Sequence, residues 1–70
     1  MASNHQLIMY WSEEEQSFIV EVPELPGCMA DGATQSEALA NAQQVIDEWI
    51  ATAKELGREI PKAKGSLILQ

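Results

Sequence analysis

The 70-residue sequence predicts a single α+β domain of β-β-β-α-β order, a mixed four-stranded sheet with one helix on one face. Three observations predict it. Two short apolar segments flank a charged turn, a Pro-Gly turn follows them, and a long apolar pattern of helical period fills the second half. A chain of this length makes one domain, here residues 1–70 with a core at about 6–69.

The first strand is predicted at Gln6–Trp11, an apolar run that is too short for a helix. Side chains alternate between the two faces of a strand. They divide here into Leu7, Met9 and Trp11 on one face, and Ile8 and Tyr10 on the other. The charged segment Ser12–Gln16 then serves as a hairpin loop.

The second strand is predicted at Ser17–Val22, where apolar and polar residues alternate. The expected inward side chains are Phe18, Val20 and Val22, and the expected outward ones are Ser17 and Glu21. Pro23 ends this strand because proline has no N–H to donate to a ladder.

A type II turn is predicted at Leu25-Pro26-Gly27-Cys28. Pro26 fixes φ near −65° and Gly27 tolerates positive φ, as the two central positions require. A short third strand, Cys28–Asp31, follows the turn, so that three strands form an antiparallel meander.

The helix is predicted to begin after Thr34, which with Glu37 matches the reciprocal N-cap pattern. Gly57 stands at the expected left-handed C′ position and Pro61 blocks any continuation. The apolar positions form one stripe: Ala38, Leu39, Ala42, Val45, Ile46, Trp49, Ile50, Ala53 and Leu56. Trp49 is expected either to pack in the core at the far end of the sheet or to lie in a contact between subunits.

The last strand is predicted at Gly65–Gln70, after an extended connection over Arg58–Lys64. A strand that returns through a helix to the same sheet favours parallel pairing, most simply with the first strand. The face away from the helix would carry Ile8, Tyr10 and Ile19 without cover, which predicts self-association. A core this small also favours a partner subunit.

The charge is strongly asymmetric. The net charge is −7, and residues 1–53 contain nine acidic residues and no Lys or Arg. Such a surface repels phosphate backbones, so we expect no direct nucleic-acid binding, and it attracts a basic partner. The alternative is that the acidity only keeps a small domain soluble.

Catalytic and cofactor chemistry is not expected. The one histidine, His5, is placed in an exposed N-terminus, and the one cysteine, Cys28, is expected to be a small buried hydrophobe. Neither a disulfide nor a zinc site can form from them, and the isolated glycines make no phosphate loop. We therefore predict a protein that is not an enzyme and binds no metal or cofactor. With no membrane span and no leader, we expect the cytoplasm.

Several segments together resemble the HicB family of antitoxins. They are Tyr10–Glu14, Phe18–Cys28, Asp31-Gly32, Glu37–Ala42 and Trp49–Pro61. The most specific feature is Val-Pro-Glu-Leu-Pro-Gly-Cys followed at this spacing by Glu-Ala-Leu. The resemblance covers roughly residues 6–69.

The resemblance implies a truncated RNase H-like fold and inhibition of a HicA-type toxin, a small basic protein that cleaves mRNA. It does not imply nuclease activity, since an RNase H site needs a carboxylate on the first strand and Leu7–Trp11 has none. Many family members carry a further DNA-binding domain. This chain ends at Gln70, so we expect no operator binding by this chain alone.

The sequence therefore predicts a HicB-like antitoxin that acts as a homo-oligomer, a dimer or larger. The candidate partner-binding residues are Glu13, Glu14, Glu15 and Glu24. The residues expected to be structural are Pro23, Leu25, Pro26, Gly27, Thr34, Glu37 and Gly57. The alternative function is an interaction or small-ligand-binding module that keeps the fold without a toxin, with a pocket beneath Pro23–Gly27.

Overall fold

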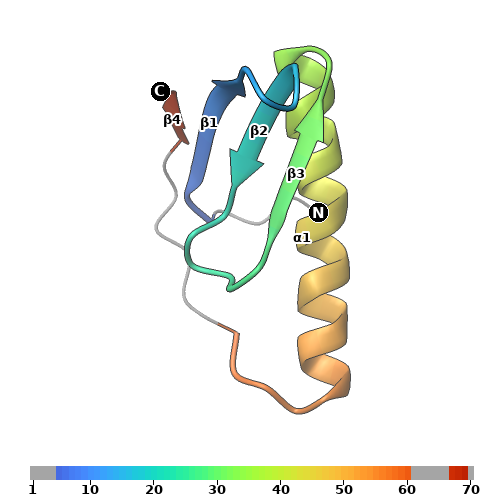
Figure 1. Cartoon of the computed structure of the whole chain (residues 1–70). Helices are drawn as coiled ribbons and strands as arrows, with labels where there is room; N and C mark the ends of the chain where they lie inside the picture. The colour runs from blue at the N-terminus through green and yellow to red at the C-terminus, as the bar shows by residue number, and fades with distance from the viewer. Residues whose placement is uncertain (1–4, 61–66, 70) are drawn as a thin grey trace.

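The computed structural model describes residues 5–60 and the backbone of residues 67–69. Three antiparallel strands, β1 (Leu7–Ser12), β2 (Ser17–Glu21) and β3 (Met29–Gly32), are followed by one helix, α1 (Gln35–Glu55) (Figure 1). The predicted α+β arrangement is confirmed. The segment predicted to be an extended connection lies partly outside the described residues, and so do Gly65, Ser66 and Gln70 of the predicted last strand.

The strands pair in the order β3-β2-β1-β4, where β4 is the short segment Leu67–Leu69. Tyr10 of β1 lies opposite Ile19 of β2, which in turn lies opposite Asp31 of β3. The segment β4 runs parallel to β1, with Ile68 opposite Ile8. The first and third strands each begin one residue later than the sequence pattern predicts.

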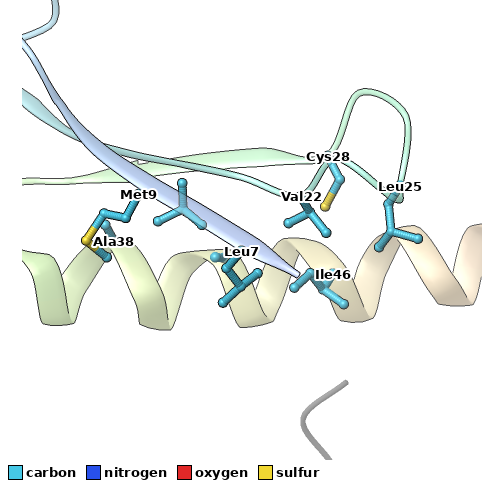
Figure 2. Close-up of a cluster of buried hydrophobic side chains, with 9 residues drawn as sticks. Leu7, Met9, Val22, Leu25, Cys28, Ala38 and Ile46 are labelled. Carbon is cyan, nitrogen blue, oxygen red and sulfur yellow. The ribbon is translucent and has the colours of Figure 1, made fainter. Parts of the chain in front are cut away.

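The core lies between the sheet and α1, and its side chains come from both layers (Figure 2). Alternation along the strands turns Met9 and Val20 toward the helix, where they are 2% and 0% exposed. The helix lies over β3 and β2 (Figure 1). The remaining fully or nearly fully buried members are Leu7, Val22, Leu25, Cys28, Ala38, Ala42 and Ile46.

The predicted caps at Thr34 and Gly57 are confirmed, but of the reciprocal N-cap pattern the described hydrogen bonds show only the half in which Thr34 accepts. Thr34 Oγ1 accepts a hydrogen bond from the Glu37 N–H at 3.1 Å. At the other end Gly57 has φ +71°, its N–H donates to the Lys54 carbonyl, and the Arg58 N–H donates to the Ala53 carbonyl. This pair of bonds is the Schellman motif, which satisfies two carbonyls of the last turn.

The stripe on α1 is confirmed except at its last member. Ala38, Ala42, Ile46 and Ala53 are buried, but Leu56 is 66% exposed. Leu56 is the C-cap, so it lies past the part of the helix that the sheet covers. Helical spacing alone could not show where the sheet ends.

The segment from Val22 to Cys28 forms a closed loop of two consecutive turns. The Cys28 N–H donates to the Leu25 carbonyl at 2.9 Å and Gly27 has φ +78°, which confirms the type II turn. The Leu25 N–H donates to the Val22 carbonyl, and the Val22 N–H donates to the Cys28 carbonyl and closes the loop. Leu25 inserts its side chain into the core with 0% exposure.

Trp49 joins this loop to the helix. Its indole Nε1–H donates to the Pro26 carbonyl at 3.0 Å, and the Arg58 guanidinium lies 5.6 Å from the ring centroid. The ring itself packs against the core, as predicted. The indole is thus held at three sides, by apolar contact, by a hydrogen bond and by a cation.

Two polar residues expected to be exposed are buried. His5 is 8% exposed, because the chain before β1 is held against the loop by the Gln6 N–H, which donates to Glu24 Oε1 at 2.8 Å. Ser17 is also 8% exposed, since it closes the hairpin directly opposite Ser12. The expectation for Cys28 is confirmed: it is 4% exposed and unpaired.

We predict that Gly27→Val lowers the free energy of unfolding by about 1–2 kcal/mol, because a β-branched residue resists the left-handed φ. An added Cβ would meet nothing within 4 Å, so the loss is conformational and not steric. Chemical denaturation measures it. Gly27→Asn, which tolerates this φ, is the control and should lose less; an unchanged midpoint in Gly27→Val would mean that the turn is misassigned.

We predict that Gly32→Ala loses more stability than Gly27→Ala, for a different reason. A Cβ at Gly32 would lie 2.4 Å from the Ala38 backbone nitrogen, so β3 and the helix would have to move apart. Overpacking of this kind costs about 1–3 kcal/mol. Thermal unfolding of the two alanine variants side by side makes the comparison, and equal losses would contradict the close approach.

Candidate partner-binding surface

Glu13, Glu14 and Glu15 lie exposed in the turn between β1 and β2, at one end of the sheet (Figure 1). The turn has hydrogen bonds of its own: the Glu15 N–H donates to Ser12 Oγ at 3.2 Å, and Gln16 Nε2 donates to the Glu13 carbonyl at 2.7 Å. Gln16 takes a left-handed φ of +52° to make this turn. The structure therefore presents these three carboxylates together, toward solvent.

Glu24 lies in a different place. It belongs to the loop between β2 and β3, at the opposite end of the sheet from the Glu13–Glu15 turn (Figure 1). Its Oε1 accepts the Gln6 N–H, and its Oε2 is buried without a hydrogen-bond partner among the described residues. The carboxylate is engaged by the chain's own backbone, so the structure does not bring Glu24 together with the other three.

The face of the sheet away from α1 carries a hollow of about 430 Å³. Ile19 forms its floor and is 8% exposed, although the sequence places it on an uncovered face. The surrounding residues shield it: the rest of the lining is Tyr10, Ser12, Glu15, Met29, Ala30 and Asp31. We call this surface the helix-free face. Alternation along the strands places Tyr10, Ile19, Met29 and Asp31 on this face, whereas Ala30, opposite Val20, also packs against the core. Alternation does not show the depth of the hollow.

A hydrogen bond between β1 and β2 orders one side of this face. The Tyr10 hydroxyl donates to Glu21 Oε2 at 2.6 Å. This hydrogen bond raises the pKa of the Tyr10 phenol above its usual value, and burial and the charge of Glu21 add to the effect. The hydrogen bond therefore holds the Glu21 side chain beside Tyr10 at the surface.

An aromatic pair lies at the hairpin end of the sheet, on the helix side. The rings of Trp11 and Phe18 meet edge to face with centroids 5.1 Å apart. Trp11 nevertheless stays 43% exposed, directly before the acidic turn. Its position on the inward face follows from alternation, but alternation does not show that its side chain stays exposed.

Two smaller hollows flank the Val22–Cys28 loop. One, of about 240 Å³, lies between Gly27, Cys28 and the second half of the helix, and Arg58 closes its end. The other, of about 160 Å³, is lined by the loop itself. Burial raises the pKa of the Cys28 thiol beside the first hollow, which makes it a weak nucleophile.

Positive charge among the described residues is confined to Lys54 and Arg58, at the C-terminal end of α1. Within residues 5–60, no three His, Cys, Asp or Glu side chains converge to form a group that could hold a metal ion. In the same part of the chain, no helix is long and apolar enough to cross a membrane. Within residues 5–60, the hairpin end and the helix-free face therefore carry carboxylates and no lysine or arginine.

Comparison with known proteins agrees with these features. Residues 7–68 match the family model described as the HicB-like antitoxin of bacterial toxin–antitoxin systems. A UPF0150 protein of Thermoplasma acidophilum is 34% identical over 55 residues, which cover 79% of this chain and 80% of that protein. A UPF0150 protein of Synechocystis is 31% identical over 64 residues, covering 91% and 86%.

A third relative comes from Haemophilus phage HP1, an uncharacterised 14.9 kDa protein encoded in the rep-hol intergenic region. It is 41% identical over 46 residues, which cover 66% of this chain and 35% of that protein. No solved structure matches the chain. The family match spans nearly all of the described fold, from β1 to β4. The chain belongs to the HicB-like antitoxin family, whose role is regulatory, with a toxin as its partner.

Proposed function

We propose that this chain binds and neutralises a basic HicA-type toxin through its acidic surface, as a homo-oligomer in the cytoplasm. The observation that carries the proposal is the exposed carboxylate cluster Glu13–Glu15 at one end of the sheet. No Lys or Arg occurs before residue 54 to neutralise it. A toxin that holds RNA needs a basic surface, and opposite charges on two partners increase their association rate.

The role of Glu24 in this proposal is indirect. Its carboxylate is half-buried and accepts a hydrogen bond from the Gln6 N–H. We therefore expect Glu24 to add negative charge near the loop between β2 and β3, and not to contact the toxin directly. The three hairpin glutamates are the stronger candidates for direct contact, because their side chains are exposed. The proposal includes neither catalysis nor direct nucleic-acid binding.

We also propose that the short parallel segment β4 completes a mixed four-stranded sheet of the truncated RNase H-like type. The pairing of Leu7 with Leu67 and of Met9 with Leu69 supports this. Self-association has its own support in two large hydrophobic side chains left exposed away from the helix-free face, Trp11 and Leu56. A domain of this size gains stability from burying such surface against another subunit.

The alternative function is a small-ligand-binding module. It would use the hollow beneath Gly27 and Cys28, where Arg58 could pair with an anion and Trp49 offers an aromatic wall. The two hollows at the Pro23–Gly27 loop, of about 240 and 160 Å³, are smaller than most small-molecule sites, which measure about 300–1,000 Å³. We therefore prefer the antitoxin role; a small molecule retained through purification and seen by native mass spectrometry would reverse this preference.

The antitoxin role predicts a salt-sensitive complex. The HicA-type protein encoded beside this chain should co-purify with it, and surface plasmon resonance should show association slowing as salt rises. Replacing Glu13, Glu14 and Glu15 by Gln should reduce the association rate about tenfold at low salt. The matched control replaces three exposed acidic residues of α1, Asp47, Glu48 and Glu55, by the corresponding amides. This control should reduce the association rate less than the hairpin variant does.

Two results would contradict the proposal. If no HicA-type protein is encoded nearby and none co-purifies, the antitoxin role fails for this chain. If the hairpin and helix variants slow association equally, only net charge matters and the hairpin is not the site. Light scattering of the purified chain tests the homo-oligomer separately, and a monomer at all concentrations would exclude it.

A further inference from the structure

We propose that the helix-free face is the surface that receives the toxin, and that it binds a basic surface with an apolar centre. This inference rests on the proposed antitoxin function and names the surface that performs it. The face has the composition of an interface, an apolar centre within a charged rim. The centre is Tyr10, Ile19 and Met29, and the rim is Glu15, Glu21 and Asp31.

The apolar centre is accessible to another protein. Met29 is 52% exposed and Tyr10 is half-buried. Between them the hollow descends to Ile19. An apolar side chain that enters this hollow would contact all three residues and displace water from them.

The charge of the rim determines which kind of partner can bind to this face. Glu15 of the hairpin turn and Asp31 of β3 line the hollow, and Glu21 of β2 lies beside it, bonded to the Tyr10 hydroxyl. Glu21 is fixed by the hydrogen bond from Tyr10, which reduces the entropy that a partner must remove on binding. No described cation lies on this face, because Lys54 and Arg58 are at the end of the helix that packs on the other face.

The same rim disfavours a second copy of this chain as the occupant. Two copies that meet through this face would bring their rim carboxylates together, and like charges across an interface oppose association. Nucleic acid and an anionic membrane are disfavoured for the same reason. A basic protein surface is the occupant that this combination of shape and charge fits.

The test uses the double variant Met29→Lys/Asp31→Lys with the HicA-type protein as the probe. Both side chains are exposed, and the change places two cations on the face that receives a basic partner. The matched control is Gln44→Lys/Asp47→Lys, which makes the same change in net charge on the exposed side of α1. We expect the Kd to rise about tenfold or more in the first variant and markedly less in the control.

Methionine-methyl NMR gives a second reading that needs no variant to fold. Met29 lies on the helix-free face and Met9 lies buried under the helix, so the two methyl groups report on opposite faces. Addition of the HicA-type protein should shift or broaden the Met29 signal and leave Met9 nearly unchanged. Circular dichroism checks that the lysine variants keep the fold.

The outcomes are distinguishable. If the wild-type chain forms the complex but the Met29 signal does not change and both lysine variants bind alike, the antitoxin role stands and this surface is wrong. If the wild-type chain forms no complex, both proposals fall. If Met29→Lys/Asp31→Lys instead lowers the mass of the free oligomer in light scattering, the face is the subunit contact and this inference is overturned.

Discussion

The hydrogen bond from the Trp49 indole to the Pro26 carbonyl joins two parts of the molecule that are distant in the sequence. On one side is the loop from Val22 to Cys28, and on the other is the second half of a 21-residue helix. At the opposite end of the sheet the closeness of Gly32 and Ala38 holds β3 against the start of that helix. One contact is polar and directional and the other is steric. Together they fix the only helix that the described residues provide to cover the core.

This arrangement explains why function is expected on one side. The helix lies over β3 and β2, and its buried stripe supplies one wall of the core. Nothing among the described residues covers the sheet face away from α1. On that face, only the side chains of the sheet itself separate the backbone from water. That face carries a hollow with an apolar floor and an acidic rim, whereas the loop at Pro23–Gly27 is occupied with holding the fold. The described residues thus place the contacts that hold the fold on one side of the sheet and leave the hollow of the helix-free face open on the other.

Local chemistry made much of this fold predictable. Pro26 and Gly27 predict their turn, and Thr34 and Gly57 predict the helix ends, because each needs only neighbours in sequence. Contacts that join distant segments were not predictable. The hydrogen bonds from Gln6 to Glu24 and from Trp49 to Pro26 depend on the tertiary fold, as does the burial of His5. For the candidate surface, sequence reasoning found the exposed Glu13–Glu15 cluster but could not foresee that Glu24 is held by the backbone. Strand alternation predicts that Tyr10 and Ile19 lie on the same face. The hollow between them was not predictable, because it depends on how neighbouring side chains pack in the folded sheet.

Asn41, on the first half of the helix, donates its side-chain amide to the Asp31 carbonyl at 2.7 Å. Asp31 belongs to β3, which is an outer strand of the sheet, and outer strands are templates on which further chains can stack. The amide occupies one acceptor of that template, and the helix lies alongside it. The side chain of Asn41 thereby makes this margin of the sheet a poorer template for pairing with a further chain.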